Sequence, residues 1–185
     1  MHAKIALGLT LLVTAACGQE WPREIRVDQR FTAQEMTEIR AAVSEVNKLG
    51  GLIDQDQLVK IAGRFTDEDG NFSQGNVDDG EDQLYRIGSA EQCWEFVKRY
   101  QSRFGVIDNL YGFFTGTDIG ILVFNTYRDN RSLRCVVMHE LGHMAGMDHV
   151  TNNRHAVMDA HSCGVLSFTA ADREQFCLQH GCDPD

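Results

Sequence analysis

The sequence predicts one domain of the mixed α/β (α+β) class behind a short processing segment. The chain has 185 residues, 43% of them apolar, which is enough for a single hydrophobic core. Segments typical of strands are interspersed with segments of helical period, without repeats. No second long apolar run or linker interrupts the chain, so residues 25–185 are expected to form this domain.

The first sixteen residues, 1–16, have the features of a signal peptide. Lys4 provides positive charge, and an apolar run extends from Ile5 to Ala16. Its twelve residues rise about 18 Å as a helix, too short to cross a hydrocarbon core of about 30 Å. The run ends in TAAC, which resembles the lipobox of bacterial lipoproteins, whose cysteine is lipidated. We expect an exported protein of the bacterial cell envelope, anchored in a membrane through Cys17; cleavage that leaves a free Cys17 thiol is the alternative.

Charge and cysteine content narrow the possible partners and pairings. The formal charge of −10 disfavours binding to phosphate backbones, so no nucleic-acid partner is expected. After Cys17, five cysteines remain, at positions 93, 135, 163, 177 and 182, and an exported chain can keep disulfides. At most two bridges can form and one thiol is left over, but the spacing does not decide the pairs.

The first half of the domain begins with a tether over residues 17–24 and a strand at 25–27. Residues 32–49 have apolar side chains at helical spacing, and Thr32 with Glu35 forms a capping box. Strands are expected at 57–63 and 84–87 and a helix at about 90–103, where Ser89 and Gln92 form the cap.

A polar loop over residues 66–82 joins the second and third strands. Asp67, Asp69 and Asn71 are spaced like the start of a calcium-binding loop. However, the glycine is at the fourth position and the twelfth residue is Asp78, whereas an EF-hand loop has glycine sixth and glutamate twelfth. A solvated acidic loop is therefore the expectation, with Ca²⁺ binding as the alternative.

The second half of the domain is expected to contain a loop, a strand and two helices. Residues 109–118 are expected to form a glycine-rich loop and residues 119–125 an apolar strand. A helix begins at Leu133, an irregular segment follows it, and Thr169 with Asp172 has the pattern of a cap for a final helix.

The Leu133 helix contains two histidines on one face. His139 and His143 are four residues apart, about 400° of helical rotation, so both imidazoles can reach one metal ion. Glu140 lies about 100° further round, where it can contact a metal-bound water and not the metal. Gly146 can adopt positive φ, end the helix and turn the chain, so that His149 returns as a third ligand. A histidine-rich helix without a role is the alternative, and it must explain five residues at fixed offsets.

The segment HELGHMAGMDH resembles the zinc signature HExxHxxGxxH of the metzincin peptidases. Met158, nine residues beyond His149, looks like the Met-turn methionine at the spacing of the matrixins. The resemblance implies a metzincin-like zincin fold: a twisted mixed sheet, an active-site helix, and a C-terminal subdomain with the Met-turn and a last helix. No Tyr lies two residues after Met158, so the tyrosine ligand of astacin-like enzymes is not expected.

The resemblance also implies an activity, that of a zinc-dependent endopeptidase hydrolysing protein or peptide substrates. One catalytic Zn²⁺ would be held by His139, His143 and His149, and Glu140 would take the proton of the water and pass it to the leaving amine. Met158 would pack beneath the metal. The strand at 119–124 would be the edge that pairs with substrate, through the residues Gly120, Ile121, Leu122 and Val123.

The sequence is also compatible with two other functions, and it does not decide the roles of several side chains. The protein could be a surface-anchored binding protein with a structural zinc, or a peptidase that is self-inhibited by its tail or by a Cys163 thiolate. His161 could line the cleft, but a solvated loop is the expectation, and His155 and His180 are also expected to be solvated. The chain is expected to be a monomer. Since seven residues separate Cys17 from the first strand, no propeptide with a cysteine switch is expected.

Overall fold

The computed structural model describes residues 20–66, 81–99, 110–151, 153–161 and 163–184. The predicted signal peptide, the lipidation site Cys17 and residues 67–80 of the acidic loop lie outside the described residues, and the predictions about them stay predictions. None of the described helices is long and apolar enough to cross a membrane.

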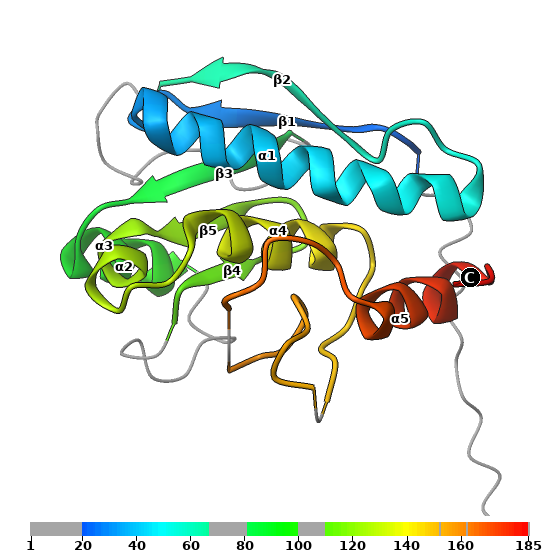
Figure 1. Cartoon of the computed structure of the whole chain (residues 1–185). Coiled ribbons are helices and arrows are strands. Elements are labelled where there is room, and N and C mark those ends of the chain that lie inside the picture. The colour runs from blue at the N-terminus through cyan, green and yellow to red at the C-terminus, as the bar shows by residue number, and fades with distance from the viewer. Residues whose placement is uncertain (1–19, 67–80, 100–109, 152, 162, 185) are drawn as a thin grey trace, which may run out of the picture.

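A five-stranded mixed sheet forms the centre of the described fold, in the order β2-β1-β3-β5-β4 (Figure 1). Four strands are mutually parallel, and β4 pairs antiparallel with β5 at one edge. The predicted α/β class is confirmed. The strand bounds are β1 Arg23–Asp28, β2 Val59–Phe65, β3 Asp82–Ile87, β4 Gly112–Phe114 and β5 Ile119–Leu122.

Helices α1 (Ala33–Gly50) and α4 (Leu133–Met144) pack against each other on one face of the sheet (Figure 1). The predicted capping box begins α1: the Glu35 amide donates to the Thr32 hydroxyl at 3.2 Å, and the Thr32 amide donates to the Glu35 carboxylate at 2.8 Å. The main hydrophobic core lies between these helices and the sheet. This core fixes the position of α4 against β4 and β5. Helix α4 contains the first part of the motif that resembles the zinc signature.

A smaller cluster occupies the other face of the sheet. Tyr85 and Ile87 of β3 pack there with Cys93 and Val97 of α2 (Ala90–Arg99), whereas Leu84 belongs to the main core. Such alternation is what a strand that is buried on both faces requires.

The structure corrects the prediction for residues 109–125 in two ways. The expected glycine-rich loop contains β4, and the expected strand ends at Leu122, because the chain turns into helix α3 (Val123–Arg128). The Thr126 hydroxyl donates to the Leu122 carbonyl at 3.1 Å, and Asn125 donates to the Leu110 carbonyl at 2.8 Å. An apolar run fits a buried strand or a buried helix equally well, so only these tertiary contacts decide the boundary.

The last helix, α5 (Ala170–His180), begins with the predicted cap of Thr169 and Asp172. Between α4 and α5 the described chain has no strand or helix, and Figure 1 shows this segment beneath α4, on the side away from α1. The short 3-10 helix Gly51–Ile53 follows α1. The space around the three histidines is therefore bordered by α4, by β4 and by this irregular segment.

Candidate active site

Helix α4 places His139 and His143 on one face, as the four-residue spacing predicts. Their Nε2 atoms are 3.1 Å apart, and the rings meet edge to face. Nearly all of α4 is buried, so the helix cannot rotate to present another side.

The chain turns sharply at Gly146, which has a φ of +83°. The Met147 amide donates to the Gly142 carbonyl at 3.0 Å, and the Gly146 amide donates to the His143 carbonyl at 2.9 Å. These two bonds define a Schellman motif with glycine in the left-handed position. The turn brings the His149 Nε2 atom to 3.2 Å from the Nε2 atoms of both other histidines. The three predicted ligands therefore converge on one point.

Two backbone carbonyls fix the tautomers of the ligand rings on α4. His139 Nδ1 lies 2.7 Å from the Val157 carbonyl oxygen, and His143 Nδ1 lies 2.8 Å from that of Met147. A carbonyl oxygen only accepts hydrogen bonds, so each Nδ1 carries the hydrogen and each neutral ring turns an Nε2 lone pair toward the triad.

Both of these rings are neutral near pH 7. Burial, together with the nearby His143, lowers the pKa of His139 to about 4. Burial also lowers the pKa of His143. Lone pairs that face one another at these distances repel, and a cation between them converts the repulsion into coordination.

The donor set fits zinc. Zinc binds imidazole nitrogen at about 2.0–2.1 Å with tetrahedral geometry, which places two ligand nitrogens about 3.3 Å apart. The Nε2 separations here are 3.1–3.2 Å. Within the described ranges, the triad is the one group of His, Cys, Asp or Glu side chains that could hold a metal. Three protein ligands leave a fourth position, as in catalytic zinc sites.

Glu140 is buried next to the triad, and its carboxyl group lies against β4. Burial raises its pKa to about 8. A Cβ atom added at Gly112 would lie 2.8 Å from both Cγ and Oε1 of Glu140. Glycine at the first residue of β4 therefore gives the Glu140 side chain its room. The sequence contains no local signal for this role of Gly112, since the contact joins two elements that are 28 residues apart.

A cleft of about 520 Å³ opens above these residues. Its walls are β4 with the two residues before it, one face of α4, the turn at 146–149, and the segment after Met158. The lining residues include His139, Glu140, His143, His149, Tyr111, Gly112, Phe113 and Phe114. The triad and the glutamate thus share one open space with the edge of the sheet.

The expected substrate-pairing strand is corrected by the sheet order. Gly120, Ile121 and Leu122 belong to β5, which is paired on both sides, with β3 and with β4, and Val123 belongs to α3. The edge beside the cleft is β4, Gly112–Phe114. The Phe113 ring lies over Gly120, where any Cβ would collide with it. Which strand lies at the edge of the sheet depends on pairing between distant segments, and the apolar content of a strand does not specify that pairing.

Met158 is fully buried against α4, beside Gly142, and its place beneath a metal ion stays a prediction. A Cβ atom at Gly142 would overlap its sulfur, so that glycine of α4 leaves the space the thioether fills. The Met158 carbonyl accepts from the Val150 amide at 2.9 Å, which ties it to the residue after His149.

Asp172 fixes the same turn from the other side. Its fully buried carboxylate accepts from the amides of Val157 at 3.0 Å and Met158 at 2.9 Å, in addition to its bonds with Thr169. The Val157 carbonyl in turn orients His139. The sequence predicted Asp172 as a helix cap, and the capping pattern could not reveal this second role.

The cysteines form the two bridges that the count allows: Cys135–Cys163 and Cys177–Cys182. Cys163 is therefore not a thiolate, and the proposed inhibition by Cys163 is wrong. The remaining described thiol, Cys93, is buried, and burial raises its pKa to about 11, so it is a weak nucleophile.

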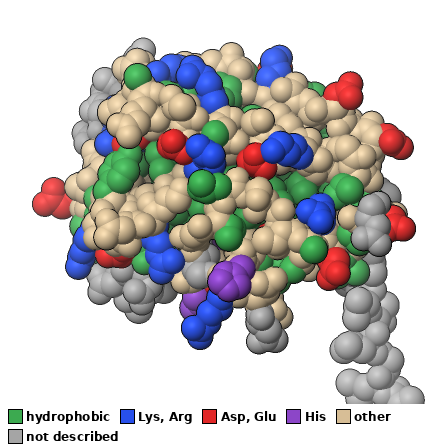
Figure 2. All heavy atoms as spheres, viewed as in Figure 1, with side chains coloured by type: hydrophobic (Ala, Val, Ile, Leu, Met, Phe, Trp, Pro, Cys, Tyr) green, Lys and Arg blue, Asp and Glu red, His purple; other side chains and the backbone are tan. Residues whose placement is uncertain are grey.

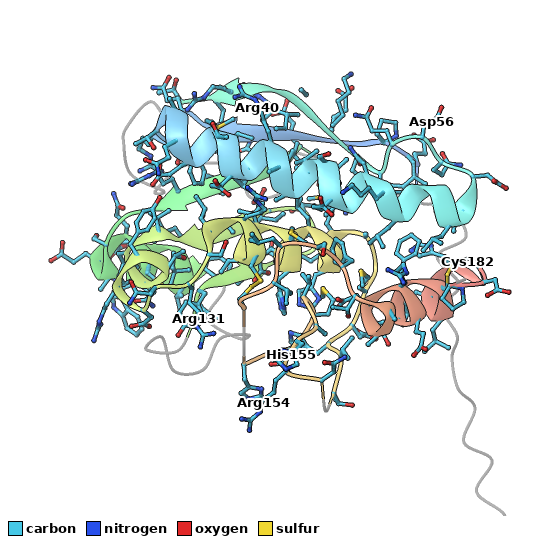
Figure 3. The ribbon with its side chains drawn as sticks, in the orientation of Figure 1. Arg40, Asp56, Arg131, Arg154, His155 and Cys182 are labelled. Atoms are coloured by element: carbon cyan, nitrogen blue, oxygen red, sulfur yellow. A yellow bond between two sulfur atoms is a disulfide. The ribbon has the colours of Figure 1, made fainter. Side chains whose placement is uncertain are left out.

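The other histidines in the described part of the chain divide into two groups. His155 and His161 are exposed, although His161 lines the cleft. Figure 2 shows a histidine and a basic side chain at the lower edge of the molecule, where Figure 3 labels His155 and Arg154. His180, expected to be solvated, is half-buried: its Nε2 lies 2.8 Å from the Ala145 carbonyl oxygen, and its ring packs on Phe176. It therefore attaches α5 to the end of α4.

No protein-family model matches the chain, and no curated protein matches it significantly. The assignment of a function thus depends on the chemistry of the site.

Proposed function

We propose that the protein is a zinc-dependent endopeptidase of the metzincin type, exported and anchored in the cell envelope by a lipid on Cys17. The observation that carries the proposal is the convergence of three imidazole Nε2 atoms at 3.1–3.2 Å, with a buried glutamate beside them in an open cleft. A general base beside a three-ligand site is the arrangement of hydrolytic zinc centres.

The chain would hold the metal through His139, His143 and His149. Bound zinc supplies Lewis acidity, which lowers the pKa of a water molecule and polarises a carbonyl group. The carbonyls of Val157 and Met147 keep the rings of His139 and His143 aimed at one point, so little reorganisation accompanies binding.

Glu140 is the proton carrier of this proposal. Its carboxyl group is protonated at neutral pH in the metal-free protein, and a nearby dication favours the ionised form. The carboxylate then accepts a proton from the attacking water and returns it to the leaving nitrogen. β4 lies at the edge of the described sheet and lines the cleft, so an extended peptide can add beside it as a further strand.

The proposed location rests on two features. The N-terminal segment resembles a lipoprotein signal ending at Cys17. Two disulfides in the described part of the chain suit an oxidising compartment outside the cytoplasm.

The alternative is a surface-anchored binding protein with a structural zinc. A structural site needs no base and prefers four protein ligands. Zinc analysis and cleavage of a peptide library by residues 18–185, with Glu140→Ala as the control, separate the two functions. We expect one zinc per chain in both proteins and cleavage by the wild type alone. Equal rates in both would refute the catalytic role of Glu140.

A further inference from the structure

The packed part of the domain begins only four residues after Cys17, the proposed lipidation site. The Trp21 ring is partly buried against the main core and meets the His180 ring edge to face, with the ring centres 6.2 Å apart. The Arg23 amide donates to the Leu58 carbonyl at 2.9 Å, and β1 starts at this residue, two residues earlier than expected. The predicted tether is therefore attached to the domain from Trp21 onward.

The side chain of Arg23 holds the start of β1 against the end of β4. Its Nε donates to the Asp82 carboxylate at 2.7 Å, and its Nη2 donates to the Gly116 carbonyl at 3.3 Å. Its guanidinium lies 6.0 Å from the centre of the Phe114 ring, at the last residue of β4. We call this end of the sheet, with Trp21 and Arg23, the Trp21 end.

Helix α5 connects the Trp21 end with the histidine triad. The His180 ring, which contacts Trp21, lies with its Nε2 2.8 Å from the Ala145 carbonyl oxygen, and Gln179 donates to the Asp148 carboxylate at 3.4 Å. Ala145 and Asp148 belong to the turn that returns the third histidine to the other two. Figure 1 shows the start of β1 and α5 at one end of the molecule, with α2 and α3 at the opposite end.

The proposed lipid therefore lies close to the candidate metal site. The four residues from Cys17 to Trp21 extend about 14 Å at most. The path from Trp21 through His180 and Ala145 to the Nε2 atom of His143 adds about 30 Å at most. A lipid on Cys17 thus keeps the triad within about 45 Å of the membrane surface, roughly the diameter of a domain of this size.

The strands run away from the Trp21 end, and β4 returns to it. β1, β3 and β5 are parallel, so all of them begin at this end, and the antiparallel β4 finishes there. Phe114 is therefore the residue of β4 nearest the Trp21 end, and Gly112 is further away. An extended segment that leaves the bilayer beside the enzyme can lie along β4 without reversing its direction.

We propose that the substrates of this peptidase are other membrane-anchored proteins, cleaved in the extended segment next to the bilayer. The inference rests on the proposed peptidase function and on the lipid at Cys17, and it adds the class of substrate. Two proteins anchored in one membrane meet at a high effective concentration if both sites lie at the same height. The short attachment at Trp21 fixes that height for the enzyme.

The test uses the lipidated, zinc-loaded full-length protein in phosphatidylcholine vesicles. A reporter with one transmembrane helix carries a sequence that the enzyme cleaves as a soluble peptide. This sequence is placed either ten residues after the helix or beyond a polyproline spacer of about 80 Å. The near sequence should be cleaved at least about tenfold faster than the far one, because only the near sequence lies within reach of the anchored cleft.

An insertion into the attachment tests its length directly. Forty Gly and Ser residues between Glu20 and Trp21 add up to about 140 Å of chain, so the near-to-far ratio should fall at least about threefold. The matched control has the same insertion after Asp185, which leaves the chain between Cys17 and Trp21 unchanged, and it should keep the wild-type ratio. All three proteins should cleave the soluble peptide at the same rate.

The outcomes separate the inference from the proposed function. If the wild type cleaves the soluble peptide but cleaves near and far sequences equally, the inference is wrong and the peptidase function stands. The same conclusion follows if the insertion before Trp21 leaves the ratio unchanged. A Cys17 without lipid overturns both the inference and the proposed location, whereas a zinc-loaded protein that cleaves no peptide at all overturns the peptidase function itself.

Discussion

Asp172 is expected to control both the stability of the domain and its affinity for zinc. In Asp172→Asn, the side chain keeps one acceptor oxygen, but an NH₂ group replaces the other and faces either the Met158 amide or the amides of Val157 and Thr169. Donor then faces donor in a fully buried position. An unsatisfied buried donor costs about 1–3 kcal/mol, and the weakened cap adds about 1 kcal/mol. We therefore expect a loss of about 2–4 kcal/mol, or roughly 5–15 °C in Tm.

The effect on zinc follows from the neighbouring carbonyl. The Val157 carbonyl accepts the Nδ1 hydrogen of His139 at 2.7 Å, and the Met158 N–H of the same peptide group donates to Asp172 at 2.9 Å. Removal of such an outer partner typically lowers metal affinity 10–100-fold, so Asp172→Asn, which displaces the carbonyl without removing it, should lower zinc affinity by about tenfold. Competition with a chromophoric chelator, at a temperature where the variant is folded, measures this affinity.

Thr32→Ala is the control for a loss of stability alone. It removes a cap of similar type from α1, where the Glu35 amide donates to the Thr32 hydroxyl, and Thr32 does not line the cleft. It should lower stability by about 1 kcal/mol and leave zinc affinity unchanged. If Asp172→Asn is destabilised as expected but binds zinc within twofold of the wild type, the link from Asp172 through Val157 to His139 is wrong.

Two further predictions concern the site. Gly112→Ala should lower kcat by about 100-fold with zinc content unchanged, because the added Cβ displaces Glu140. The control is Gly63→Ala in β2, which should keep wild-type activity because no atom lies within 4 Å of the added Cβ. Equal kcat values for the two variants would contradict this prediction. The metal-free protein should lose about 2 kcal/mol between pH 6.5 and 8. The pKa of Glu140 rises from 4.5 to about 8 on folding, so stability falls as pH rises through that window. Below pH 6.5 the lowered pKa of His139, about 4, opposes this trend, because the unfolded chain takes up the proton first. Denaturant titrations should show no alkaline loss in Glu140→Gln.

The histidine triad was predictable because its geometry is almost entirely local. Four residues of helix separate His139 from His143, and one glycine in the left-handed region returns His149 to them. The capping residues of α1 and α5 were predictable for the same reason, since a cap is a contact over three residues.

Contacts between distant segments could not be predicted from local sequence patterns. β4 has three residues, and it is a strand because Phe113 pairs with Gly120 and Gly112 pairs with Ile121. The same pairing moves the edge of the sheet from β5 to β4. The choice of Cys163 as the partner of Cys135 likewise depends on the path of the chain after Met158, which no spacing specifies.

The arrangement of α4 explains why these distant contacts still produce a well-defined site. Cys135, His139 and Gly142 form one stripe along the helix, at intervals of four and three residues. Each meets the segment 157–163 by a different interaction: a disulfide, a hydrogen bond to a carbonyl, and packing of a thioether against a glycine. The ligand His139 thus lies between two fixed points, one turn away on either side. Preorganisation of a ligand in this way reduces the entropy lost when a metal binds. The stripe that holds the segment therefore also sets the geometry of the candidate metal site.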